Sequence, residues 1–428
     1  VLLLLIKKKM KTINKWIINI PDKFIQWFRG FTDAEGCFLI VKTGNSYAFR
    51  FIIKLHKDDL TLLNHIKSSL GNIGNIAIEG SQAYFKVTSI SEIRSIIEIF
   101  SIYPLNSSKY LDFLAFREAY LLYTSLDRKS DNSQNVLQRI DSLKESMNSK
   151  RTNFNIPVLD IKESEYKIHI TDEWLLGFIE GDGSFSVTKD NFTLIFSISQ
   201  RGNLALMEAI QNYLSNLANC ITEGETFNSN VIYLTKSINN NTSLSEATKF
   251  NYVLIIKSEI FINKVLIPYL DSLTFHSKKK LDYLDWKTIS QIRNLGLHFL
   301  PEGKKLIELI KSQMNNKRLS NSGNKPVSRH YINSEVSRLL NEVSNNYETI
   351  NGKIFIRSLN KFHHNRNKIQ VKLCDQEGIV FKTFDSMNQC AEFVGISAHT
   401  VSKKMKTGVP IKYDNKEFLI VQSKRAIA

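Results

Sequence analysis

The chain has 428 residues, 43% of them apolar, which is long enough for two or three domains with ordinary packed cores. Lys and Arg number 57 against 41 Asp and Glu, a net charge of +16, so we expect a polyanion as partner, with nucleic acid ahead of a membrane surface. The four scattered cysteines form no C-x-x-C pair, which argues against a zinc site or a disulfide scaffold, and the run VLLLLI is too short to span a bilayer.

In chain order, the first predicted element is a helix that opens at Asp22 and runs into WFRGFTDAEGCF, residues 27–38. Residues 37–56 then read as two strands around a Gly44-Asn45 turn. The pattern continues with a helix over 58–71, a strand over 83–90 and a helix over 91–100.

The second half repeats this order. A helix opens at Thr171 and runs into WLLGFIEGDGSF, residues 174–185. Strands, a helix, further strands and a last helix are then predicted over 184–200, 204–217, 230–234, 251–258 and 259–270. Each half is therefore predicted to be an α+β unit with the order αββαββα, in which helices cover one face of an antiparallel sheet.

Three sequence elements recur in the same order in both halves. The acid motifs at 27–38 and 174–185 lie 147 residues apart. YPLNSSKYLDFLAF (103–116) matches LTFHSKKKLDYLDW (273–286) at an offset of 170, and LKESMNSKR (143–151) matches IKSQMNNKR (310–318) at an offset of 167. Three ordered matches indicate a duplication, with domains at 20–152 and 160–318 and an insertion of roughly twenty residues in the second half, placed in the polar stretch 237–250.

The rest of the chain differs in character. Residues 319–360 are polar and are predicted to be a linker. Residues 361–423 predict a hairpin followed by two short helices joined at Gly395, with Asp385 and Ser397 as N-caps. Two helices with a tight turn make a helix-turn-helix candidate.

An apolar helix that ends in an acid and a glycine is usually a core helix, and one copy of the acid motif would deserve that interpretation. Two copies change it, because Gly30 with Ala34, and Gly177 with Gly181, are small residues at helical spacing that let two helices pack closely. The acids at the two helix ends would then converge and repel unless cations lie between them. Convergent oxygens in a basic protein suit Mg²⁺, which can activate water beside a phosphodiester.

These residues resemble the two motifs of single-chain LAGLIDADG homing endonucleases encoded by mobile introns. The resemblance covers roughly residues 20–320 and includes all three repeated elements. It implies that the last acid of each motif, Glu35 and Asp182, binds the catalytic divalent metals, Mg²⁺ or Mn²⁺. It assigns Asp33 and Glu180 to structure at the helix ends, beside the interface glycines Gly30 and Gly177.

The resemblance also implies three further catalytic groups. Lys109 and Lys279 fall where the family places basic residues beside the scissile phosphates, although Lys278 and Lys280 leave the second register open by one residue. Gln200 matches a position that orients active-site water. Aligning Leu60 with Leu204 makes His56 the counterpart of Gln200, so only one half offers an amide.

The family fold implies two pseudo-symmetric domains whose sheets form a saddle over the DNA major groove. Strand parity then assigns DNA contacts, with hydroxyl and basic groups reading base edges. The predicted DNA-facing residues of the first half are Leu39, Val41, Thr43, Arg50, Ile52 and Lys54. Those of the second half are Ser184, Ser186, Thr188, Thr193, Ser197 and Ser199.

The tail resembles the nuclease-associated modular domains fused to intron endonucleases. That resemblance implies a helix near Ser397 in a DNA groove, with Lys403, Lys404 and Lys406 on phosphates; a small packed appendage with a solvated basic face is the alternative.

The function implied is a metal-dependent, site-specific double-strand DNA endonuclease for intron homing, which acts as a monomer on a target of about twenty base pairs. An intron maturase that binds its own intron RNA is the alternative, and a transcription regulator on the same scaffold is a third. The retained acids and lysines favour the nuclease. The abundance of Asn, Ile and Lys suggests an organellar gene and hence the mitochondrion.

Overall fold

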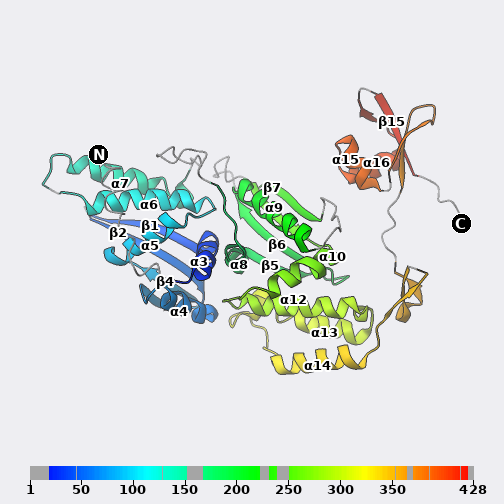
Figure 1. Cartoon of the computed structure of the whole chain (residues 1–428), viewed down its shortest axis with the longest axis horizontal. Helices are drawn as coiled ribbons and strands as arrows, with labels where there is room; N and C mark the ends of the chain where they lie inside the picture. Colours follow the sequence, from blue (N-terminus) through cyan, green and yellow to red (C-terminus); the bar gives the residue numbers. More distant parts are fainter. Residues whose placement is uncertain are drawn as a thin grey trace. The chain divides into compact units, whose positions relative to one another are not determined.

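The structure is a computed structural model (Figure 1) that describes residues 19–44, 46–127, 129–151, 167–221, 231–238, 250–351, 353–363, 370–384, 386–414 and 416–422. The chain divides into two compact units, Val1–Ser344 and Asn345–Ala428. None of the helices in these ranges is long and apolar enough to cross a membrane.

The first half of unit 1 begins with α3 (Asp22–Glu35), which leads directly into β1 (Gly36–Thr43). The elements that follow are β2 (Ser46–His56), α4 (Leu60–Ser69), β3 (Asn75–Glu79), β4 (Gln82–Val87), α5 (Ile90–Ile102), α6 (Lys109–Thr124) and α7 (Ser133–Glu145). The four strands form one antiparallel sheet in the order β1-β2-β4-β3.

The second half repeats the design from α8 (Asp172–Asp182) and β5 (Gly183–Val187). Its other main elements are β6 (Leu194–Arg201), α9 (Leu204–Ile221), β7 (Ile232–Ile238), β8 (Phe250–Ile256), α10 (Glu259–Phe261), α11 (Ile267–Asp271), α12 (Lys279–Asn294) and α13 (Pro301–Lys311). The sheet order β5-β6-β8-β7 matches that of the first half. The predicted α+β class with two pseudo-symmetric αββαββα domains is confirmed.

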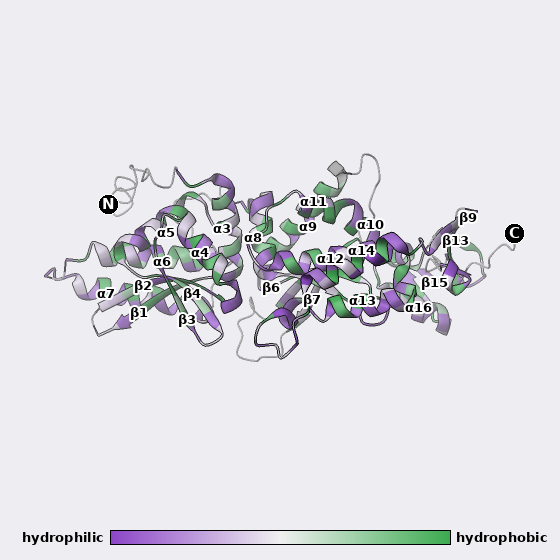
Figure 2. Ribbon diagram, turned by 90° about the horizontal axis from the view of Figure 1, so that it is seen from below, coloured by the Kyte–Doolittle hydropathy of each residue, from purple (hydrophilic) through white to green (hydrophobic). Residues whose placement is uncertain are grey.

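Alternating side chains give each sheet one buried face and one open face. In β2, Tyr47, Phe49, Phe51 and Ile53 are buried, while the residues between them are more accessible. Figure 2 shows α4, α5 and α6 on one side of the strands β1 to β4. The buried residues of both halves belong to one continuous hydrophobic core, so the two halves are packed together and not merely tethered.

The extra residues of the second half are divided between two places. One share lies in α9 and the segment after it, since α9 has 18 residues where α4 has 10. The other lies between β7 and β8, where residues 239–249 fall outside the described part of the chain. The prediction of a single insertion at 237–250 therefore located only one of the two.

The segment 319–360, predicted as a linker, carries regular structure. Helix α14 (Arg329–Glu342) packs on α13 with Ile332 and Leu339 buried, so residues up to 344 complete unit 1. The remainder forms a small sheet in unit 2, made of β9 (Tyr347–Ile350), β10 (Lys353–Ile356) and β11 (Lys361–Phe362). Helix α14 was not predicted because its sequence is mostly polar, as it can be in a helix that buries only one face.

The rest of unit 2 has its own hydrophobic core. It consists of β12 (Val371–Cys374), β13 (Val380–Phe384), α15 (Met387–Val394), α16 (Ala398–Thr407), β14 (Ile411–Tyr413) and β15 (Lys416–Gln422). The two predicted helices are present and Gly395 joins them with a left-handed backbone, but they pack on a four-stranded sheet whose last two strands were not predicted. Ser386, and not Asp385, which lies outside the described residues, caps α15, while Ser397 caps α16.

Candidate active site

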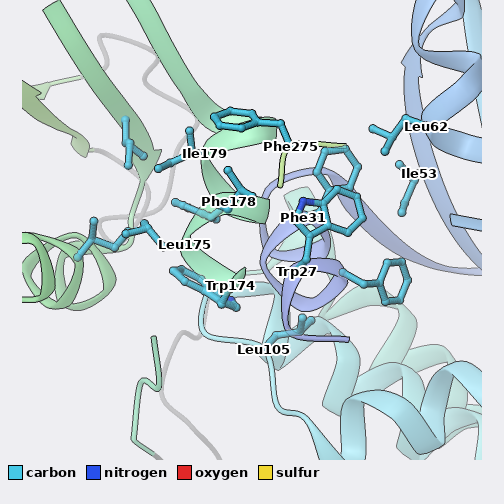
Figure 3. Close-up of a cluster of buried hydrophobic side chains, with 14 of the residues drawn as sticks. Trp27, Phe31, Ile53, Leu62, Leu105, Trp174, Leu175, Phe178, Ile179 and Phe275 are labelled. Atoms are coloured by element: carbon cyan, nitrogen blue, oxygen red, sulfur yellow. The ribbon is translucent and has the colours of Figure 1, made fainter. Parts of the chain in front are cut away.

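Helices α3 and α8 pack against each other without intervening side chains at two points. A Cβ on Gly30 would lie 1.9 Å from the carbonyl oxygen of Trp174, and a Cβ on Gly177 would lie 2.1 Å from that of Trp27. Both distances are far below van der Waals contact, so glycine is required at each position. Figure 3 shows α3 and α8 side by side, with Trp27 and Phe31 on α3 and Trp174 and Phe178 on α8.

The two inner acids, Asp33 and Glu180, bind the indole of the opposite helix. Trp27 Nε1 donates to Glu180 Oε2 at 2.6 Å, and Trp174 Nε1 donates to Asp33 Oδ2 at 2.9 Å. Burial raises the pKa of both carboxyls, and these hydrogen bonds oppose that rise. Each acid therefore gains one of its hydrogen bonds only when both helices are present.

The same two acids also anchor the turns that precede the lysine-bearing helices. Asp33 accepts hydrogen bonds from the backbone N–H groups of Asn106 and Ser107 at 2.7–3.1 Å. Glu180 accepts from the N–H groups of His276 and Ser277 at 2.6–3.2 Å. The inner acids thus fix the start of α6 and of α12.

The outer acids, Glu35 and Asp182, are the last residues of α3 and α8, and both side chains are half-buried. The pKa of Asp182 is raised to about 7, first by burial and then by the negative charge of Glu35. Burial also raises the pKa of Glu35, while Lys109 and Lys279 lower it. The two carboxylates therefore share one electrostatic environment with two lysines, although they come from different halves.

Lys109 and Lys279 are the first residues of α6 and α12, and both reach back to the acid motifs. Lys109 Nζ donates to the carbonyl oxygen of Ala34, and Lys279 Nζ donates to that of Gly183 at 2.8 Å. Lys278 and Lys280 have exposed side chains, so Lys279 is the lysine of its run that faces the site. Burial lowers the pKa of Lys109, and the charges of Asp182 and Glu35 counteract this effect.

Gln200 lies beside one of the two outer acids. Its Nε2 donates to Asp182 Oδ2, and its Oε1 accepts from Asn203 Nδ2 at 3.2 Å. The alignment that made His56 its counterpart is wrong by one residue. Gly36 pairs with Ile53 and Gly183 pairs with Ile198, which makes Leu55 the equivalent position.

Neither Leu55 nor His56 carries a side-chain amide, so only the second half offers one at this position, as expected. The first half has one more residue than the second between its central strand and the next helix, which includes the short 3₁₀ turn Lys57–Asp59. That extra residue shifted the alignment.

Among the hydrogen bonds across the halves that the sequence did not predict, two lie next to the lysines. Asn203 Oδ1 accepts from the backbone N–H of Ser108 at 3.0 Å, and Asp59 Oδ1 accepts from that of Lys278 at 3.2 Å. Each acceptor lies just before a helix of one half, and each donor lies just before the catalytic-lysine candidate of the other. Asp59 and Asn203 directly precede the equivalent leucines Leu60 and Leu204, and this shared placement is the sequence signal that could have pointed to the two hydrogen bonds.

The third repeated element has a structural explanation. Asn148 and Asn315 adopt left-handed backbone angles (φ 55° and 54°), and their side-chain amides donate at 2.9 Å to the carbonyl oxygens of Phe38 and Phe185. Their backbone N–H groups bind Asp112 and Asp282 at 2.9 and 2.8 Å. Arg151 and Arg318 pair with the same aspartates. The element therefore fastens the end of each domain to the strand that follows its acid motif.

The residues predicted to face DNA lie on the open face of the two sheets, opposite the helices. Arg50 and Lys54 are exposed, whereas their neighbours Phe51 and Ile53 are buried. Ser197 and Ser199 alternate in the same way with buried Ile198. Leu39, Val41, Thr43, Ile52, Ser184 and Ser186 follow this parity as well, and Thr188 and Thr193 sit at the hairpin between β5 and β6.

The outer strands add open-face residues that sequence reasoning omitted because it considered two strands per half. Lys54 pairs with Tyr84 across β2 and β4, and Ile52 pairs with Lys86. In the second half, Ser197 pairs with Ile255, which pairs in turn with Tyr233 of β7. Strand parity applied to all four strands would have found them.

The three lysines of α16 have different surroundings. Lys403 and Lys406 are exposed, while Lys404 Nζ donates to the carbonyl oxygen of Pro410 at 3.0 Å. Two of the three ammonium groups are thus available at the surface for an anionic ligand.

The outer acids suit a divalent cation in the chemistry of their donors. Both supply carboxylate oxygens, the ligands that Mg²⁺ and Ca²⁺ prefer, and their mutual repulsion would be relieved by a cation between them. Within the described ranges, no three His, Cys, Asp or Glu side chains gather as a metal site. The protein would therefore supply two carboxylates and leave other positions to water, backbone carbonyls or a phosphate.

Comparison with known proteins adds the family context. The sequence profile of LAGLIDADG endonucleases matches residues 28–120 and 175–290. The uncharacterized mitochondrial protein RF1 of Saccharomyces cerevisiae is 27% identical over 424 residues, which cover 95% of this chain and 83% of that protein. The probable intron-encoded endonuclease Cox1-I1b of Schizosaccharomyces pombe is 27% identical over 307 residues, 68% of this chain and 71% of that protein.

Solved structures agree with these relatives. The LAGLIDADG homing endonuclease I-GzeII, in complex with its DNA target, aligns with a TM-score of 0.53 at 27% identity, over 68% of this chain and 99% of its own. The LAGLIDADG meganuclease I-CpaMI, bound to uncleaved DNA, aligns with a TM-score of 0.54 at 26% identity, over 68% of this chain and 99% of its own.

Proposed function

We propose that this chain, which belongs to the LAGLIDADG endonuclease family, is a site-specific double-strand DNA endonuclease that serves intron homing. The observation that carries the proposal is the meeting of Glu35 and Asp182, one from each half, at the end of two packed helices. A monomer with two such halves suits a duplex with two scissile strands. The fungal relatives, one of them named as mitochondrial, confirm the predicted mitochondrial localisation.

Glu35 and Asp182 would hold Mg²⁺ or Mn²⁺, and the ion would supply activation of water and stabilisation of the leaving oxygen. The hydrogen bonds to motif carbonyls hold the ammonium groups of Lys109 and Lys279 close to the outer acids. From there the two lysines would stabilise the negative charge that builds up on the attacked phosphate. Gln200 would orient water or the Asp182 carboxylate in one half only. The two strands would therefore be cut in chemically different sites.

An intron maturase remains the other function of this scaffold. The convergent carboxylates favour the nuclease, since RNA binding needs no metal-binding acids. Lys109 and Lys279 favour it because they lie beside these acids, where a nuclease needs positive charge near the attacked phosphate.

The first test is cleavage of the insertion-site duplex, defined as the sequence formed when the two exons flanking the protein's own intron are joined. Purified protein with Mg²⁺ should cut this duplex in both strands. Glu35→Gln and Asp182→Asn should each lower the cleavage rate at least about 1,000-fold while leaving the affinity for DNA in Ca²⁺ within a few-fold, because the carboxylates serve the chemical step.

Glu98→Gln, on α5, is the matched control and should cut at the wild-type rate. Wild-type cutting by both site variants would overturn the assignment of the carboxylates. Failure of the wild-type protein to bind or cut the duplex would overturn the function itself.

A further inference from the structure

We propose that the two sheets recognise the two half-sites of the DNA by different chemistry, the first through long basic side chains and the second through short hydroxyl groups. This inference rests on the DNA-cleaving function proposed above. It concerns how binding energy and sequence preference are distributed over the target.

The open face of the first sheet carries a basic cluster, defined here as Arg50, Lys54 and Lys86, in which the Tyr84 ring lies against the two lysines. Lys54 Nζ lies 5.6 Å and Lys86 Nζ lies 4.3 Å from the centroid of the Tyr84 ring. Contact with the ring face favours both ammonium groups and holds their long side chains over the sheet. The two lysines of the cluster are therefore held in place before any ligand arrives.

Much of this positive charge is uncompensated. Lys86 pairs with Glu79 at 2.7 Å, but Arg50 and Lys54 have no carboxylate partner among the residues that the structure describes. Both side chains are exposed, and they lie on the same strand, four residues apart. Guanidinium and ammonium groups in a groove bind phosphates or the O6 and N7 acceptors of guanine.

The open face of the second sheet differs. Its strands present hydroxyl groups at successive open-face positions, namely Ser184 and Ser186 of β5, Ser197 and Ser199 of β6, and Thr235 and Ser237 of β7. Arg201, at the end of β6, is the basic residue of this face on the described strands.

Two of these hydroxyls already have partners within the sheet. Ser199 Oγ binds Asn251 Oδ1 at 3.1 Å, and Thr235 Oγ1 donates to the carbonyl oxygen of Val253 at 3.2 Å.

The consequences differ for the two half-sites. A basic side chain that contacts a phosphate releases a counterion, which makes binding depend on salt, whereas a neutral hydroxyl does not. A hydroxyl can donate to or accept from almost any base edge, so it discriminates less than an arginine placed on guanine. The half-site under the first sheet should thus supply most of the salt-dependent affinity and prefer guanine, and the half-site under the second should tolerate more substitutions.

The test compares two double variants on equivalent strands, Arg50→Ala with Lys54→Ala, and Ser197→Ala with Ser199→Ala, bound to the insertion-site duplex in Ca²⁺ at several salt concentrations. The basic double variant should bind about 100-fold more weakly at low salt, with a salt slope lower by about two. The hydroxyl double variant should bind less than about tenfold more weakly, with an unchanged slope. Lys305→Ala, on the exposed side of α13, is the control and should match the wild type.

The same measurement on duplexes with one half-site randomised tests the division of chemistry between the sheets separately from the endonuclease function. The hybrid that keeps the half-site under the first sheet should bind more tightly than the other, because only there do Arg50 and Lys54 meet their guanines, while contacts to phosphates persist on both hybrids. Equal binding of the two hybrids, or equal losses in the two double variants, would overturn the division of chemistry while leaving the endonuclease intact. If the wild type binds the intact duplex no better than a fully random one, the endonuclease proposal itself fails.

Discussion

The ionisation of Asp182 is strongly disturbed by its position. Its carboxyl is half-buried and lies in the field of Glu35, and its pKa is raised from 3.8 to about 7. A carboxyl whose pKa rises on folding binds its proton more tightly in the folded state. Its ionisation therefore destabilises the fold as the pH climbs from about 4 to about 7, and the full cost is present above pH 7.

Replacing this carboxyl should stabilise the metal-free protein at alkaline pH. Asp182→Asn removes the cost of ionisation, and we expect a gain on the order of 1 kcal/mol at pH 8, after allowance for partial solvent exposure, that vanishes towards pH 4. Thermal unfolding of wild type and variant at both pH values measures this difference. Added Mg²⁺ should shrink the difference at pH 8, because only the wild type gains from binding the ion. A variant less stable than the wild type at pH 8 without metal would contradict the view that the ionised Asp182 carboxylate destabilises the fold.

Asn148 can be tested for the two separate things it does. Its amide holds the carbonyl oxygen of Phe38, and its backbone has φ 55°, a region that disfavours most side chains. Asn148→Gly should cost about 1 kcal/mol for the lost hydrogen bond, and Asn148→Ala should cost about 1 kcal/mol more for the strained backbone. Urea unfolding of the two variants separates these costs. An alanine variant as stable as the glycine variant would show that the backbone angle carries no strain.

At the scale of elements, the packing of α3 on α8 depends on the two interface glycines. Gly30→Ala places a methyl group 1.9 Å from the carbonyl oxygen of Trp174, and helix backbones cannot yield as a flexible side chain can. We expect a loss of at least about 2–3 kcal/mol, together with weaker cleavage, because the outer acids move apart. Gln134→Ala, at an exposed position of α7, is the control and should change the unfolding free energy by less than about 0.5 kcal/mol. Wild-type stability of Gly30→Ala would refute the close approach.

The elements that are predicted best from the sequence are those that a repeated motif or a clear alternation of side chains marks out. The acid motifs were located correctly because a duplicated apolar helix ends in each of them, and the open-face residues followed from alternation along the strands. Leu55 was missed because the extra residue that precedes α4 leaves no trace in local pattern. Strands β14 and β15 were missed because seven or fewer residues in a charged tail carry little periodic signal. The hydrogen bonds between halves depend on how the halves pack, and the equal placement of Asn203 and Asp59 before α9 and α4 is the one sequence sign of two of them.

At the scale of the molecule, the two units have separate hydrophobic cores, which makes the chain divisible. A protein ending at Ser344 should fold and cut the insertion-site duplex, since both carboxylates and both lysines lie in unit 1. If unit 2 binds DNA through Lys403 and Lys406, the truncated protein should bind about tenfold more weakly and leave a shorter footprint. Lys403→Ala with Lys406→Ala in the full chain should reproduce most of that loss. Equal affinity and an equal footprint in all three proteins would show that unit 2 does not touch the target.

The exchange of indole and carboxylate between α3 and α8 limits how such proteins can be recombined. Trp27 donates to Glu180 and Trp174 donates to Asp33, so neither half carries the indole donor for its own buried acid. Two copies of the first half would set Trp27 against Asp33, a carboxylate one methylene shorter than the one it now reaches. Joining halves from different ancestors therefore requires matching the acid of one to the indole of the other. Because each domain carries the acid that the other domain's indole reaches, the two domains of this chain are not interchangeable copies.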